Sequence, residues 1–191
     1  MKKFLISLIK YNLPIIFIVL FIALFLPKYL TMHLNYNILL VNKIMVGSAI
    51  ITIIVVIISS WLSDYINIYK IYSVSSILLI LCSYGIFYYI NSNNNLYMII
   101  AIYSLSFIVG IATGTICRVI CNIFDTQIRL TGVAVCYNTG FAIIGGIIPI
   151  STEVLINKLN LIIAPTIVSI IIGLVCLGAI TIIQKDKRVN R

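Results

Sequence analysis

Six long apolar runs dominate this sequence and limit what the chain can fold into. They cover residues 11–30, 40–61, 71–90, 96–117, 132–156 and 162–183. A helix needs about 20 mainly apolar residues to cross the hydrocarbon core of a bilayer, which is about 30 Å thick. Because each run meets that length, we expect an all-α membrane protein of about six transmembrane helices. These helices would form a single domain over residues 1–191.

The composition favours lipid as the solvent of this chain. Hydrophobic residues make up 62% of the sequence and charged residues 9%, whereas soluble domains carry about 25% charged residues. In water, so much apolar surface would form large exposed patches and aggregate. The N-terminus also resembles a secretory signal, but its apolar run continues past any cleavage-like position. We therefore expect the first span to be retained.

The positive charges predict the orientation in the membrane. Of the 13 Lys and Arg residues, all except Lys28, Lys43 and Lys158 fall on the face that carries both termini. Lys and Arg near helix ends prefer the cytoplasmic side. We therefore expect a multi-pass protein of the cytoplasmic (inner) membrane with both termini cytoplasmic. Topology thus accounts for the net charge of +9, and nucleic-acid binding would need a soluble basic platform that this chain lacks.

Few polar groups are available for chemistry. The single histidine, His33, is expected in an outer loop without an obvious partner, and the five cysteines contain no CxxC pair. We therefore expect no catalytic residues, no cofactor and no metal site, and hence no enzyme. Asp64 is expected in a cytoplasmic loop, Arg118 at the inner end of the fourth span and Glu153 at the outer end of the fifth. Aromatic residues near the span ends are expected to anchor at the membrane interface: Tyr29, Tyr36, Trp61, Tyr65, Tyr69, Tyr72 and Tyr97.

The fifth span is the least ordinary helix. Its inner half carries Tyr137 and Asn138, and its middle carries Gly145, Gly146 and the helix-breaking Pro149. Small residues let neighbouring helices approach closely, and proline frees a backbone carbonyl that another group must satisfy. These features fit either a helix that lines a cavity or a tightly packed buried helix. In the fourth span, Gly110 and Gly114 form a GxxxG pattern that indicates helix packing.

The segment FDTQIRLTGVAVCYNTGFAIIGGIIPI, from Phe124 to Ile150, resembles the major facilitator superfamily, and in particular its metabolite–proton symporter branch. That branch includes proline/betaine and dicarboxylate transporters. The segment is similar to the connection between the tenth and eleventh helices of these proteins and to the eleventh helix itself. Asp125 stands where the family usually has proline. The matching residues are Phe124, Thr126, Arg129, Gly132, Tyr137, Asn138, Gly145, Gly146 and Pro149.

Two further motifs match in order and spacing. Residues 26–30, LPKYL, look like the outer end of the family's seventh helix, and residues 62–64, LSD, look like the start of its eight–nine loop. The resemblance therefore covers nearly the whole chain as helices seven to twelve of a twelve-helix transporter. That loop usually carries several arginines, and here only Lys70 keeps a positive charge nearby.

The resemblance implies a transporter of a small organic solute, such as proline, betaine or a dicarboxylate, coupled to protons. It places Tyr137, Asn138 and Glu153 at the substrate cavity, and Ser63, Asp64, Arg129 and Gly132 in cytoplasmic gating loops. Because the first six helices are expected to be missing, activity would require a separately encoded first half or a second copy. Otherwise the chain would be a truncated, inactive fragment. The alternative is a six-helix substrate-binding membrane subunit of a multi-component transporter.

Overall fold

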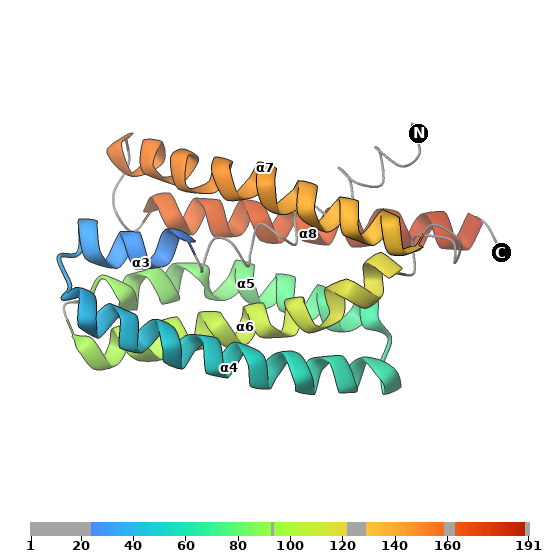
Figure 1. Ribbon diagram of the computed structural model, residues 1–191, viewed down its shortest axis with the longest axis horizontal. Coiled ribbons are helices and arrows are strands. Elements are labelled where there is room, and N and C mark those ends of the chain that lie inside the picture. Colours follow the sequence, from blue (N-terminus) through green and yellow to red (C-terminus); the bar gives the residue numbers. More distant parts are fainter. Residues whose placement is uncertain (1–23, 93, 122–128, 159–162, 190–191) are drawn as a thin grey trace.

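The computed structural model describes residues 24–92, 94–121, 129–158 and 163–189, and every regular element in these ranges is a helix. The long helices lie side by side along one axis, and successive long helices run in opposite directions (Figure 1). In chain order the elements are α3 (Leu26–Lys28), η3 (Tyr29–His33), α4 (Ile38–Tyr65), α5 (Ile68–Ile90), α6 (Asn95–Cys121), α7 (Arg129–Lys158) and α8 (Ile163–Val189).

The expected spans fall on these helices. Residues 40–61, 71–90, 96–117, 132–156 and 162–183 each coincide with one of α4 to α8. Much of the expected first span, 11–30, lies outside the described residues, and its outer end forms α3 and η3. Helix α7 has 30 residues, or about 45 Å at 1.5 Å per residue, which is long enough to cross a bilayer. The count of six spans stays a prediction.

Four of the described helices are both long enough and apolar enough to cross a membrane. They are Ile38–Tyr65, Ile68–Ile90, Asn95–Thr115 and Ile163–Thr181. Their lateral surfaces are apolar, and α4 shows this best, with Ile50, Ile53, Ile57 and Trp61 all more than half exposed. In water such a face would be an aggregation site, whereas a bilayer solvates it.

Asparagine side chains cap the N-termini of three of the helices. An N-cap side chain accepts a hydrogen bond from a backbone N–H that has no partner within the first turn. The polar breaks between the apolar runs therefore act as helix caps as well as loops. The caps are Asn37 to the N–H of Leu39 (2.9 Å), Asn67 to Tyr69 (3.0 Å) and Asn94 to Leu96 (2.9 Å).

Small residues bring α4 against α6. A Cβ atom added at Gly114 would lie 2.0 Å from Oγ of Ser59 and 2.6 Å from the backbone oxygen of Val56, so a side chain has no room there. Gly110 meets Val55 in the same way, and the Ser59 hydroxyl donates to the carbonyl oxygen of Gly110 at 3.3 Å. The GxxxG residues thus lie where the two helices cross.

Helix α5 connects the two sides of the bundle. It packs on α6 along one face and on α8 along another, whereas α4 and α5 barely touch. Gly173 of α8 lies against Ile80 of α5, at a distance that excludes a side chain. The buried polar residues of the described helices are all serine or threonine, and most donate to carbonyls of their own helix. Most of these hydroxyls are therefore satisfied within their own helix.

The aromatic residues divide into two groups, contrary to the expectation that all anchor at the interface. Tyr29 and Tyr72 are fully buried, and their rings fill space between neighbouring helices. Tyr29 packs edge-on against Phe87 and exchanges hydrogen bonds with Asn91 at 2.9–3.0 Å. Trp61 and Tyr65, in contrast, lie exposed at the end of α4, where an interfacial anchor belongs.

Candidate functional site

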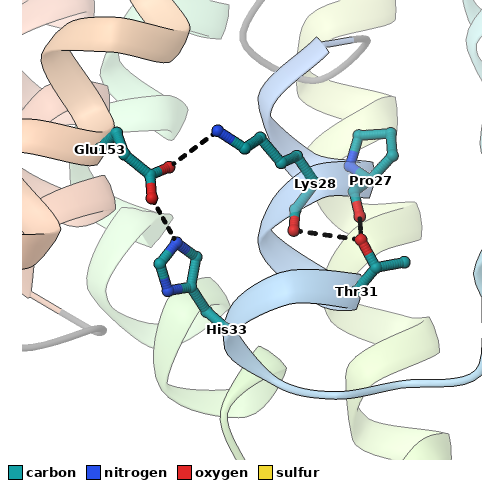
Figure 2. A network of polar contacts seen from close by, with 5 residues as sticks. All are labelled: Pro27, Lys28, Thr31, His33 and Glu153. Atoms are coloured by element: carbon teal, nitrogen blue, oxygen red, sulfur yellow. Dashed lines mark hydrogen bonds and ion pairs between the residues drawn. The ribbon is translucent and has the colours of Figure 1, made fainter.

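A cluster of three charged or ionisable side chains joins the end of the expected first span to α7. Nζ of Lys28 lies 3.2 Å from Oε2 of Glu153, and Nε2 of His33 lies 3.2 Å from Oε1 of the same carboxylate (Figure 2). The contact with His33 lacks good hydrogen-bond geometry, so it is a close approach of the ring nitrogen to the carboxylate. The Glu153 carboxylate therefore contacts two side chains of one neighbouring segment, the Lys28 ammonium group and the His33 ring.

The π-helical turn η3 is the reason that Lys28 and His33 face the same partner. In an α-helix, residues five apart point about 140° away from each other. A π turn closes hydrogen bonds between residues five apart, as the Leu34 N–H does with the Tyr29 oxygen at 3.3 Å. The wider turn brings His33 back toward the side of Lys28. Within it, the Thr31 hydroxyl donates to the oxygens of Pro27 (3.0 Å) and Lys28 (3.2 Å), as Figure 2 shows.

A second ion pair lies at the opposite end of the bundle. Nη1 of Arg118, in the last turn of α6, contacts Oδ1 of Asp64 and donates to the hydroxyl of Ser63 at 3.0 Å. The Ser63 hydroxyl in turn donates to the Ser60 oxygen at 2.6 Å. Ser63 is buried, whereas Asp64 and Arg118 are both about half exposed. This pair therefore lies at the edge of the apolar region, where water reaches the charges.

Two expectations about these residues were wrong. Ser63 and Asp64 are not in a loop, because α4 continues to Tyr65 and only two residues connect it to α5. Both residues lie in the last turn of α4, and from there their side chains reach Arg118 on α6. His33 ends η3 and has Glu153 as its partner. The sequence pattern of one span could not predict the contact between His33 and Glu153, because Glu153 belongs to a helix far along the chain.

The two ion pairs are arranged reciprocally. Lys28 ends the first expected span and pairs with the fifth, α7, whereas Arg118 ends the fourth, α6, and pairs with the second, α4. The two pairs lie at opposite ends of the long axis, as Figure 1 shows from the ends of these helices. The two cations are separated by nearly the same length of chain as the two carboxylates. If the chain is divided into two successive triplets of helices, each triplet supplies a cation to the other and receives a carboxylate from it.

The residues expected at a substrate cavity do not form one compact site. Asn138 is exposed in the first half of α7, and Glu153 lies near the other end. At 1.5 Å per residue they are about 22 Å apart along the helix, too far to bind one small solute together. The side chains of Tyr137 and Pro149 lie outside the described part of the structure, and so do the surroundings of Gly145 and Gly146. The backbone of α7 is helical throughout, and Pro149 does not end it.

The remaining expected gating residues lie at the start of α7. Arg129 is its first residue and is exposed, and Gly132 is buried one turn later. Residues 122–128, which include the start of the resembling segment, lie outside the described part of the chain. Among the described residues no group of three or more His, Cys, Asp or Glu could hold a metal ion.

Comparisons with protein-family models, with curated proteins and with solved structures each give no match. The class of protein therefore follows from the chain itself. Its helices, apolar lateral surfaces and charged ends define a helical multi-pass membrane protein.

Proposed function

We propose that the chain forms one six-helix wall of a secondary transporter for a small organic solute, coupled to protons. In this proposal the chain corresponds to the C-terminal half of a major facilitator superfamily transporter of the metabolite–proton symporter branch. It lies in the cytoplasmic membrane with both termini inside, and the Arg118–Asp64 pair faces the cytoplasm. The solute class, such as proline, betaine or a dicarboxylate, and the proton coupling come from the resemblance.

The reciprocal ion pairs carry this proposal. Each six-helix half of such transporters contains two three-helix repeats with inverted topology, related by an axis in the membrane plane. An inverted repeat predicts that a contact between the fourth and second helices at one face recurs between the first and fifth at the other. Arg118 with Asp64, and Lys28 with Glu153, have this relation. A bundle without such symmetry gives no reason for matching pairs at opposite ends.

The exposed amide of Asn138 supports the proposal that its face of α7 does not contact lipid. Asn138 lies nine residues into α7 and has no cover from the described residues. A polar side chain at that depth is costly in hydrocarbon and is usually found toward a bundle interior or a water-filled cavity. The proposal assigns this face of α7 to the cavity between two walls.

A single wall does not enclose a solute site. Secondary transporters of this kind bind solute near the bilayer midplane between two halves, and one half rocks against the other. The proposal therefore includes a partner wall, which is either a separately encoded first half or a second copy of this chain. Ser63, Asp64, Arg129 and Gly132 then belong to the cytoplasmic ends that move between states, and Glu153 to the outer end.

Uptake of radiolabelled proline, betaine and 2-oxoglutarate tests the proposal. Cells would express the chain alone, or with any six-helix first half encoded next to it, with and without a proton uncoupler. We expect uptake above the vector control that collapses with the uncoupler. Asn138→Leu should abolish it, whereas Asn42→Leu, at an exposed position in the second turn of α4, should leave it unchanged.

Two results would contradict the proposal. The first is the absence of uptake of every solute despite confirmed membrane insertion, which would favour an inactive fragment. The second is saturable solute binding to purified protein without uptake, whether the chain is expressed alone or with a first half. This result would favour the alternative of a substrate-binding subunit.

A further inference from the structure

An apolar pocket of about 340 Å³ opens on the lateral surface between α4 and α5. It exists because these two helices both pack on α6 and barely touch each other. Leu62 and Val55 of α4 form one wall, Val74 of α5 forms part of the other, and Phe107 and Ile111 of α6 form the floor. From Leu62 to Val55 the pocket extends about 10 Å along the helix axis.

The lining argues against a transported polar solute. Such a site needs several convergent polar groups to orient its ligand. The Ser59 hydroxyl is the uncharged polar side chain in this lining, and it already donates to the oxygens of Val56 and Gly110. The occupant must therefore be apolar over most of its length.

Lys70 lies at one end of the pocket and supplies its charge. It belongs to the first turn of α5, is exposed, and forms no ion pair with any described residue. Arg118 lies at the same end of the bundle, but Asp64 already partners it. The ammonium group of Lys70 thus remains free for an anion that adjoins an apolar tail.

The depth of the pocket fits this division into charged and apolar parts. The rings of Trp61 and Tyr65 pack edge to face at the exposed end of α4, with centroids 5.1 Å apart, and such rings sit at the headgroup level. Lys70 lies on the other side of the short α4–α5 connection, at about the same level. Val55 is about 15 Å deeper than Tyr65 along α4, within the hydrocarbon.

We propose that this pocket binds an acyl chain of an anionic phospholipid from the cytoplasmic leaflet, with the lipid phosphate against Lys70. Basic positions between transmembrane helices on the cytoplasmic side recognise anionic headgroups in this way. The inference rests on the predicted orientation of the bundle and does not depend on transport activity.

Spin-labelled lipids test the proposal. The purified chain would be reconstituted in dioleoylphosphatidylcholine vesicles with trace phosphatidylglycerol or phosphatidylcholine labelled near the acyl-chain end, and electron paramagnetic resonance would give the motionally restricted fraction. We expect a preference for phosphatidylglycerol of about fivefold, the effect of one lysine near the surface. Lys70→Gln should reduce the ratio to about one. Lys43→Gln, at an exposed lysine near the opposite end of α4, should not change it.

A pocket-filling variant separates a bound chain from general surface attraction. Val74→Trp should lower the restricted phosphatidylglycerol fraction, whereas Leu81→Trp, at an exposed position of α5 outside the pocket, should not. Equal losses in Lys70→Gln and Lys43→Gln would overturn the proposal, because diffuse charge would explain both. An unchanged fraction in Val74→Trp would also overturn it. So would a ratio near one in the unaltered chain, as expected if another protein segment fills the pocket.

Discussion

Glu153, Lys28, His33, Asp64 and Arg118 lie where helix ends cross. Their side chains are all partly exposed, so water and salt screen them. Exposed pairs of this kind contribute about 1 kcal/mol or less to stability. Their main effect is positional, since each pair determines which helix ends meet. Sequence predicted that each of these residues lies near an interface, but which of them pair depends on the packing of helices distant in the chain.

Exchanging the charges of Lys28 and Glu153 tests this positional role. Glu153→Lys places a second ammonium group beside Lys28, and Lys28→Glu places two carboxylates together. Each variant should lower the free energy of unfolding by about 1 kcal/mol. The double exchange should recover most of the loss because the Lys28 pair forms again with reversed polarity.

Denaturant titration in detergent micelles, followed by helical circular dichroism, measures these differences. Lys43→Glu is the matched control, because Lys43 lies near the same end of the bundle and forms no ion pair with any described residue. The pairing would be refuted if the losses of the two single variants simply added in the double variant.

At the scale of the helices, the extent of the apolar runs predicted α4 to α8 to within a few residues. Which face of each helix is buried could not be predicted, because nearly every face is apolar and the pattern has little amphipathic contrast. Tyr29 and Tyr72 illustrate this, since both are buried although their positions suggested interfacial anchors. The turn η3 was also unexpected, because a π turn has no simple sequence pattern.

Gly114→Ala tests the contact of α4 with α6. The added methyl group would lie 2.6 Å from the Val56 backbone oxygen, which cannot move without shifting α4. We expect a loss of about 2 kcal/mol from overpacking. Gly85→Ala is the control, because a Cβ there meets nothing within 4 Å. It should be neutral or stabilising by up to about 1 kcal/mol through helix propensity. Equal effects in the same unfolding assay would contradict close packing at Gly114.

The cap of α5 gives a third prediction. Asn67→Ala removes the acceptor of the Tyr69 N–H and should cost about 1 kcal/mol of stability. Asn42→Ala, at an exposed position within α4, should change stability by much less or improve it through helix propensity. The unfolding midpoint measures both, and a cost at Asn42 equal to that at Asn67 would argue against the cap.

At the scale of the whole molecule, the proposed transporter wall requires an even number of crossings and opposite faces for the two ion pairs. Sequence predicted the crossings and the orientation from apolar length and charge asymmetry. The assignment of Tyr137, Asn138 and Glu153 to a substrate cavity stays a prediction, and the length of α7 places Asn138 and Glu153 at different levels along the helix. The reciprocal arrangement of the charges emerged only when the helices were placed in three dimensions.

Sided labelling of single-cysteine variants tests the inverted architecture most directly. In a background without the native cysteines, an impermeant maleimide would be applied to intact and permeabilised cells. We predict that Ser92→Cys and Lys158→Cys react in intact cells, whereas Tyr65→Cys and Thr131→Cys react only after permeabilisation. Labelling of Lys158→Cys and Thr131→Cys from the same side would mean that α7 does not cross. The two ion pairs would then not lie on opposite faces, and the transporter proposal would lose its main support.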